Sequence, residues 1–260
     1  MNITDFIGKG FNVEQMREIR FGIAANLDIR YYADPGYNYV QMQEIRLGLE
    51  EELDVSVYAR KYFSGAQMKE IRLGMLRKLN VSIYAKIGMS SAKMREIRKG
   101  LEKNKDTASY ANRKFSAAQM HQIFLGKDSG IDVSLYSKPE FSAAQMFQIR
   151  TGLEEKLYAA VYAHPEFSAE QMQEIRLGLK NGLEVSLYAD PRYNAEQMCE
   201  IRKGLMKRLN VGLYLYQYMP AEIMQEFRQK LEEKYQTPEE SKPKDILYHQ
   251  LAFARDTIAL

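Results

Sequence analysis

The sequence predicts an all-α protein, an α-solenoid of nine 26-residue helix-turn-helix repeats with a C-terminal capping helix. The first observation is a methionine that recurs every 26 residues, at Met16, Met42, Met68, Met94, Met120, Met146, Met172, Met198 and Met224. The second is a set of columns in the same register: Ile19, Ile45, Ile71, Ile97, Ile123, Ile149, Ile175, Ile201 and Phe227; and Tyr32, Tyr58, Tyr84, Tyr110, Tyr136, Tyr162, Tyr188 and Tyr214. Units with such a period stack on their neighbours, so we expect one repeat domain over 1–236.

A longer first helix opens each repeat. Its N-cap column holds Asn12, Asn38, Ser64, Ser90, Ser116, Ser142, Ser168 and Asn194, whose side chains accept bonds from free amides of the first turn. In the repeat over 167–192, Met172, Ile175 and Leu179 follow at helical spacing. Three residues after Leu179, a column with Asn26, Asn104, Gly130 and Gly182 favours the left-handed conformation that ends a helix.

A short second helix follows, as in 185–189, with Asp, Asn or Glu at its start in most repeats. Residues 2–6 align with this element, so we expect the chain to open with the second helix of a truncated repeat. At the other end, Ile246, Leu251 and Ile258 are spaced like one helix face. We interpret 237–260 as the C-terminal cap.

Composition excludes several classes of protein. With 45% hydrophobic and 27% charged residues the chain is typical of a folded globular protein rather than a disordered or collagenous one. Its formal net charge of +3 makes it no general polycation. Cys199 is the single cysteine, and the first ten residues do not resemble a signal peptide, so we expect a cytoplasmic protein. No apolar run approaches 18 residues, so no membrane span is expected.

A glycine column inside the first helix indicates close packing. It comprises Gly22, Gly48, Gly74, Gly100, Gly126, Gly152, Gly178 and Gly204. Glycine in a helix interior costs roughly 0.5–1 kcal/mol relative to alanine, so something must offset it. The ninth repeat, which has no successor, carries Lys230 there. We therefore expect the backbone of the next repeat to approach each glycine.

An arginine column admits two interpretations. It comprises Arg20, Arg46, Arg72, Arg98, Arg150, Arg176, Arg202 and Arg228. A ladder of guanidinium groups could bind a nucleic acid. Seven carboxylates nearly cancel it, however: Glu18, Glu44, Glu70, Glu96, Glu174, Glu200 and Glu226. We favour ion pairs between repeats and keep nucleic-acid binding as the alternative. The methionine and tyrosine columns are interpreted as core.

No catalytic or metal-binding pattern is present. His121, His164 and His249 fall in three different settings, and neither a GxSxG nor a GxGxxG motif occurs. We expect no enzyme activity, no metal, no cofactor and no small-molecule substrate.

The repeat breaks its own pattern near the middle of the array. Phe124 stands in the arginine column and Lys127 in an apolar column, while Lys105 replaces a leucine one repeat earlier. Drift is one explanation. Departures from a sequence pattern also occur at functional sites. We therefore predict that a partner-binding surface is bordered by His121, Phe124, Lys127 and Phe147.

The repeat unit Phe167-Ser-Ala-Glu-Gln-Met-Gln-Glu-Ile-Arg-Leu-Gly-Leu resembles short tandem helical repeats in uncharacterised proteins of bacterial mobile elements and phages, and it spans nearly all of 2–235. The resemblance carries over no catalytic or binding residue. It implies a setting in which proteins block host defences of the CRISPR or restriction type. We therefore expect a protein-binding scaffold that inhibits such an effector.

Overall fold

The computed structural model describes residues 2–236 and confirms an all-helical series of repeats. The chain divides into two compact parts, 1–130 and 131–260, and each is described by itself. The described residues contain no strand. Their α-helices are α1 (Val13–Ala24), α2 (Tyr39–Glu50), α3 (Gly65–Leu76), α4 (Ser91–Glu102) and α5 (Ala117–Asp128) in the first part, and α6 (Ala143–Glu154), α7 (Ala169–Lys180), α8 (Ala195–Met206) and α9 (Ala221–Gln236) in the second.

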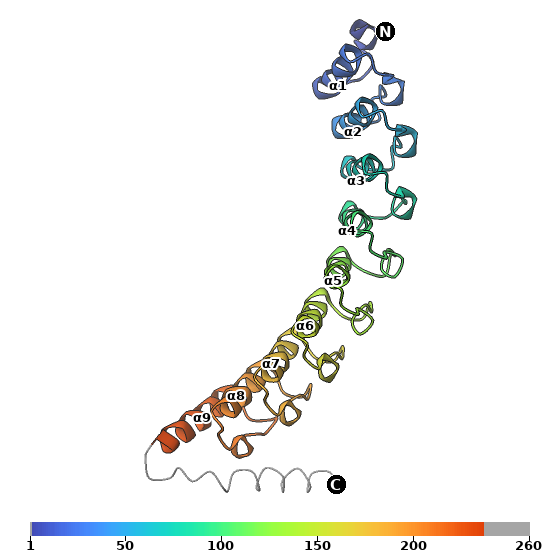
Figure 1. The fold of residues 1–260 in the computed structure, drawn as a ribbon. Coiled ribbons are helices and arrows are strands. Elements are labelled where there is room, and N and C mark those ends of the chain that lie inside the picture. The colour runs from blue at the N-terminus through green and yellow to red at the C-terminus, as the bar shows by residue number, and fades with distance from the viewer. Residues whose placement is uncertain (1, 237–260) are drawn as a thin grey trace. The chain divides into compact units, whose positions relative to one another are not determined.

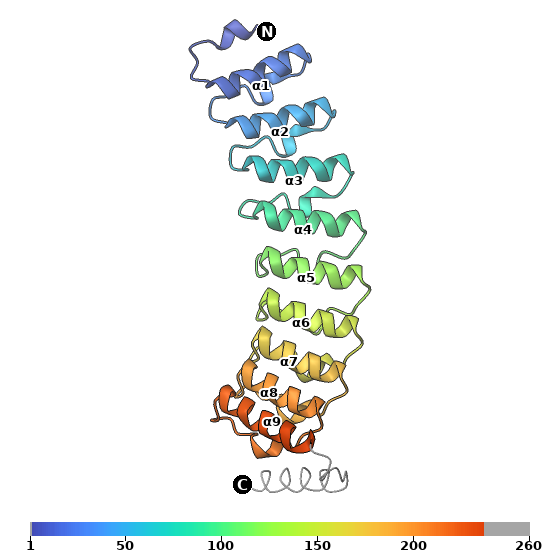
Figure 2. The same ribbon diagram turned by 90° about the vertical axis from the view of Figure 1, so that its left-hand side faces the viewer.

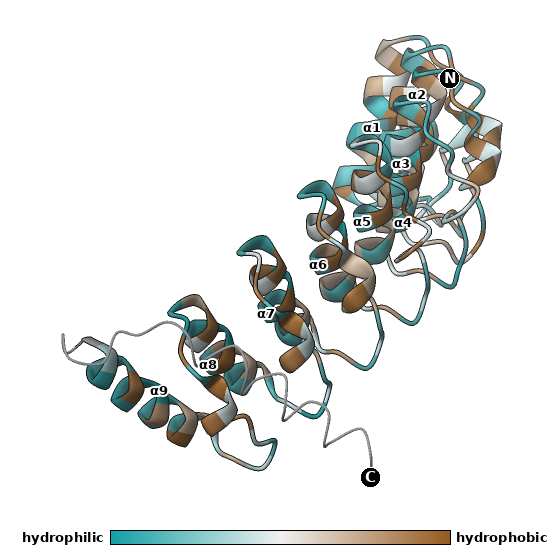
Figure 3. Cartoon of the chain, turned by 60° about the horizontal axis from the view of Figure 1, so that its bottom comes forward, coloured by the Kyte–Doolittle hydropathy of each residue, from teal (hydrophilic) through white to brown (hydrophobic). Residues whose placement is uncertain are grey.

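Consecutive α-helices pack against each other within each part, from α1 to α5 and from α6 to α9. Within each part the α-helices lie side by side in one layer (Figure 2), and the short segments that connect them form a second layer (Figure 1). Figure 3 shows hydrophobic and hydrophilic bands on each of α7, α8 and α9, as expected for helices with one buried face. No helix in the described part is long and apolar enough to cross a membrane.

The predicted N-caps are confirmed, and they have a partner that the sequence interpretation missed. Asn38 accepts a bond from the backbone N–H of Gln41, whose side-chain oxygen accepts from the N–H of Asn38 in return. The amide group of Gln41 then donates to the carbonyl of Phe63, just before the next helix, at 2.6 Å. Equivalent onward bonds join Gln15, Gln67, Gln145, Gln171 and Gln197 to the following turn. The glutamine therefore caps its own helix and links two repeats.

The predicted helix ends are also confirmed. The C-terminal column has positive φ in every one of these repeats, at Asn26, Glu52, Lys78, Asn104, Gly130, Lys156, Gly182 and Arg208. In the first repeat, Asn26 N–H donates to Ile23 and Leu27 N–H donates to Gly22, the bond pattern of a Schellman motif. The chain reverses at this column even where the side chain is lysine or arginine.

The second helix is a single 3-10 turn. These turns are η1 (Ile3–Phe6), η2 (Ile29–Tyr31), η3 (Val55–Val57) and η4 (Val81–Ile83) in the first part, and η5 (Ala159–Val161), η6 (Val185–Leu187) and η7 (Val211–Leu213) in the second. Residues 108–110 and 134–136 form turns instead. The structure confirms that residues 2–6 adopt the second element of a repeat, since η1 is a 3-10 turn with Phe6 buried in the register of the tyrosine column. The predicted cap, 237–260, lies outside the described residues.

The glycine column has a different partner from the one expected. A Cβ at Gly74 would lie 1.8 Å from the hydroxyl of Tyr84, which belongs to the same repeat. That hydroxyl donates to the carbonyl of Glu70 at 3.2 Å, and the side chain of Tyr84 is fully buried. The prediction that the next repeat's backbone approaches the glycine is wrong, because a phenol from the following turn occupies that space. In the ninth repeat the sequence carries Lys230 in the glycine column and Glu240 in the tyrosine column, so the two columns end together.

Candidate binding surfaces

The arginine column forms ion pairs between neighbouring repeats. Five of the eight column arginines donate through Nε to the carboxylate 28 residues earlier, which belongs to the preceding helix. The pairs are Arg46–Glu18 at 2.8 Å, Arg72–Glu44 at 2.9 Å, Arg98–Glu70 at 2.8 Å, Arg202–Glu174 at 2.7 Å and Arg228–Glu200 at 2.7 Å. Arg176 bonds Gln148 in the same way at 3.0 Å. The ion-pair interpretation is confirmed.

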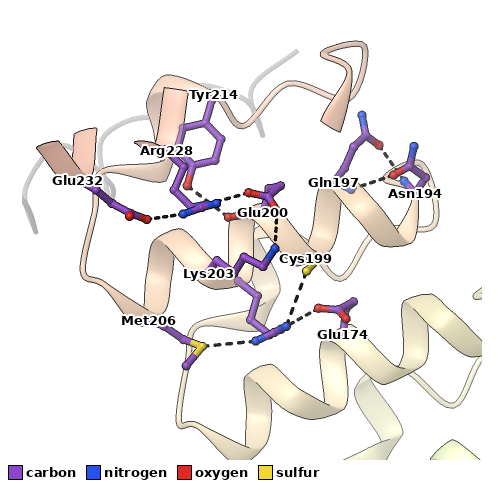
Figure 4. A network of polar contacts seen from close by, with 11 residues as sticks. Glu174, Asn194, Gln197, Cys199, Glu200, Lys203, Met206, Tyr214, Arg228 and Glu232 are labelled. Atoms are coloured by element: carbon purple, nitrogen blue, oxygen red, sulfur yellow. Dashed lines mark hydrogen bonds and ion pairs between the residues drawn. The ribbon is translucent and has the colours of Figure 1, made fainter. Parts of the chain in front are cut away.

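A second acceptor holds the far side of most guanidinium groups. Arg72 Nη1 lies 2.7 Å from Glu51, and Arg228 also pairs with Glu232, as Figure 4 shows. Burial lowers the pKa of the Arg72 guanidinium, but hydrogen bonds to Glu51 and Glu44 outweigh it and hold the pKa above its ordinary value. The group therefore stays charged with two carboxylates around it.

These contacts leave little of the arginine column for a polyanion. The side chain of Arg72 is 9% exposed and that of Arg150, which pairs with Glu154, is 11% exposed. Arg20 differs because it forms no ion pair among the described residues and is exposed. A nucleic acid could reach the other arginines only by replacing their carboxylate partners.

In the irregular fifth repeat, other residues of the first part make up for the side chains that depart from the repeat pattern. Phe124 is buried, 6% exposed, so its ring is not offered to a partner. It leaves Glu96 without the usual arginine, and His121 Nδ1 takes that place at 2.8 Å. Lys127 Nζ lies 3.1 Å from Asp106 and the side chain is 19% exposed. Of these three predicted residues, His121 has the most accessible side chain, at 42% exposed.

Phe147 belongs to the second part of the chain, 131–260. It lies on α6 with 42% of its surface exposed, and the guanidinium carbon of Arg150 is 5.5 Å from its ring centroid. The ring is therefore accessible, as the sequence indicated.

The accessible side of the α-helix layer differs from repeat to repeat. We define the outer face as the residues one, five and eight positions after each column methionine. The position next to the methionine holds Arg17, Gln43, Lys69, Arg95 and His121 in the first part, and Phe147, Gln173, Cys199 and Gln225 in the second. Unlike the buried columns, this position repeats no residue type consistently.

Apolar side chains gather on the outer face of α1, α2 and α3. Phe21 is 48% exposed and Leu76 is 45% exposed, while Leu47 and Leu73 are half-buried. The guanidinium carbon of Arg46 lies 5.3 Å from the Phe21 ring centroid. Phe21, Leu47 and Leu73 occupy one column, so they lie on three successive helices. The sequence interpretation missed this set, although the column of Phe and Leu was a usable signal.

Family models, curated proteins and solved structures all gave no match. Within residues 2–236 there is also no group of three or more metal-ligating side chains.

Proposed function

We propose that the protein is a non-enzymatic repeat scaffold that binds a protein partner through the outer face of its α-helices. One observation carries this proposal: the columns shared by the repeats are used inside the fold, whereas the outer face differs from repeat to repeat. The methionine, isoleucine and tyrosine columns fill the core, and the arginines and glutamines join neighbours. Repeat proteins of this kind bind through surfaces that stacking leaves free.

The apolar ridge, Phe21, Leu47, Leu73 and Leu76, is the part of the outer face best suited to a protein partner. Aromatic side chains carry much of the binding energy at protein interfaces, and the buried core of an interface is mostly apolar. Charged residues beside them, such as Glu50, suit the polar rim of such an interface. In the second part, Phe147 offers a similar aromatic contact. His121 is proposed as a rim residue, whereas Phe124 and Lys127 support the surface from within.

The resemblance to repeat proteins of mobile elements extends this proposal to a particular role. The partner would be a host defence effector, of the CRISPR or restriction type, that the scaffold inhibits in the cytoplasm. Purified effectors in a cleavage assay test this role separately from binding. Unchanged cleavage by effectors that the scaffold binds would contradict it.

Affinity capture with matched variants tests the binding proposal. The full chain is immobilised, incubated with bacterial lysate and analysed by quantitative mass spectrometry. The ridge variant carries Phe21→Ser, Leu47→Ser and Leu73→Ser. Its control carries Tyr31→Ser, Val57→Ser and Ile83→Ser, a column of the turn layer in the same part.

We expect a protein retained by the native chain to be lost from the ridge variant and kept by the control. Circular dichroism verifies that both variants stay helical. Equal retention by both variants would contradict a partner on the ridge.

A further inference from the structure

A second surface carries a concentrated positive charge. We define the basic edge as residues 60–69, 86–95 and 112–121, which form the turns before α3, α4 and α5 and the first turns of these helices. It contains eight basic residues and no carboxylate: Arg60, Lys61, Lys69, Lys86, Lys93, Arg95, Arg113 and Lys114. This composition is unlike that of the protein as a whole, which is nearly balanced.

The repeat itself does not require this charge. The corresponding residues before and within α7, α8 and α9 are 164–173, 190–199 and 216–225. They carry five carboxylates and one arginine, namely Glu166, Glu170, Asp190, Glu196, Glu222 and Arg192. The same fold is thus built there with a net negative charge. The basic edge is a property of three repeats and needs an explanation beyond folding.

Most of these cations lack a carboxylate partner. Lys61 pairs with Asp34 at 2.6 Å and Arg95 pairs with Glu70 at 3.2 Å. The other six form no ion pair among the described residues: Arg60, Lys69, Lys86, Lys93, Arg113 and Lys114. Lys93 is half-buried, and the other five are exposed. In the arginine column, by contrast, carboxylates neutralise most of the guanidinium groups.

Two of the six are held in place by backbone carbonyls. Arg113 Nη2 donates to the carbonyl of Ile87 at 2.7 Å, across to the preceding turn. Lys93 Nζ donates to the carbonyl of Arg113 at 3.1 Å. These bonds fix the positions of the cations without removing their charge. The first turns of α3, α4 and α5 also contain no acidic residue, so the positive ends of the helix dipoles add to the same potential.

The surroundings favour an extended polyanion over a folded protein. The large hydrophobic side chains exposed in the described basic edge are Tyr62, 56% exposed, and Ile87, 63% exposed. A protein interface needs a cluster of such anchors, whereas phosphate binding depends on cations repeated along a line. Neighbouring helices place these cations at intervals of roughly 8–10 Å. Tyr62 adds a ring on which an unpaired base can stack.

We propose that the basic edge binds the sugar-phosphate backbone of single-stranded nucleic acid without reading its sequence. The basic edge shares Lys69, Arg95 and His121 with the outer face, but it contains none of the ridge residues and does not depend on a protein partner. It also differs from the nucleic-acid alternative based on the arginine column. Its ligand contacts the free cations of the turns and leaves the ion pairs between repeats intact.

Fluorescence anisotropy with labelled 20-nucleotide single strands, dT and U homopolymers in turn, measures the binding. Six phosphate contacts give a log–log salt slope of about −4, so affinity should fall about 300-fold between 50 and 200 mM salt. The edge variant, Arg60→Gln, Lys86→Gln and Lys114→Gln, should bind more weakly at 50 mM salt, with a slope of about −2 and about a 20-fold fall.

The matched control removes the same charge elsewhere in the first part. It carries Arg20→Gln, Arg77→Gln and Lys78→Gln, three exposed residues outside the basic edge. We expect it to keep the native slope, and the ridge variant to do the same. Equal losses in the edge variant and this control, or no binding by the native chain, would overturn the proposal. Equally strong binding of a poly-glutamate peptide would overturn the assignment to nucleic acid.

Discussion

The contact between Gly74 and Tyr84 gives the sharpest test of how a repeat is held together. Alanine is ordinarily better than glycine inside a helix by about 1 kcal/mol. At Gly74, however, the new Cβ would lie 1.8 Å from the Tyr84 hydroxyl, which must move away. Gly74→Ala is therefore expected to destabilise the fold, against the ordinary helix preference.

The size of the effect follows from three contributions. Overpacking costs about 1–3 kcal/mol, and losing the hydrogen bond from Tyr84 to Glu70 costs about 1 kcal/mol. The helix preference returns about 1 kcal/mol. The net loss is thus about 1–3 kcal/mol. In a Tyr84→Phe background the hydroxyl is gone and the nearest remaining atoms, of Val81 and the ring, lie at 3.0 and 3.1 Å. There Gly74→Ala should be almost neutral.

The assay is a double-mutant cycle measured by urea denaturation, with hydrogen exchange reporting on α3 alone because repeat arrays need not unfold in one step. We expect a coupling of about 1–3 kcal/mol between the two positions. Lys230→Ala in α9, the matched position without a tyrosine, should change stability by less than about 0.5 kcal/mol. Additive effects of Gly74→Ala and Tyr84→Phe would refute the reasoning.

Three further outcomes are expected. Arg72→Gln should lower the free energy of unfolding by about 2–4 kcal/mol because it leaves the buried Glu44 carboxylate without its partner. Arg20→Gln, in the same column without such a partner, should lower it by less than about 0.5 kcal/mol. Equal urea midpoints for the two variants would contradict this. Burial raises the pKa of all eight column tyrosines, so stability should persist below pH ~10 and fall above it. Their ionisation, followed at 295 nm, should coincide with loss of helical signal, and complete ionisation of a helical protein would contradict it. Lys78→Gly should raise stability by about 1 kcal/mol in a thermal melt by relieving the φ of 56°, and a lower melting temperature would argue against strain there.

The sequence predicted the repeat because each column reflects a local requirement. A cap, an apolar stripe and a left-handed helix end all recur every 26 residues, and periodicity is sufficient to find them. The glycine column showed that space is needed but not which atoms fill it. The tyrosine column ends with the glycine column at the ninth repeat, which was a usable signal for the true pairing.

The candidate surfaces were harder to predict, because they depend on contacts between repeats. Phe124 looked like an exposed anchor until the structure placed it in the core, with His121 in the role of the missing arginine. The basic edge joins residues 26 positions apart that look unrelated in the chain. Its lack of carboxylates becomes visible only when successive turns are placed side by side.

The central claim is that the shared columns build the fold and the outer face binds a protein partner. A saturation mutagenesis scan of 2–236, scored in parallel for protein abundance and for retention of the captured partner, tests it most directly. We expect substitutions in the methionine, tyrosine, glycine and arginine columns to lower abundance. Those on the outer face should lower retention at unchanged abundance. Retention losses that fall mainly on the arginine column at unchanged abundance would contradict the claim.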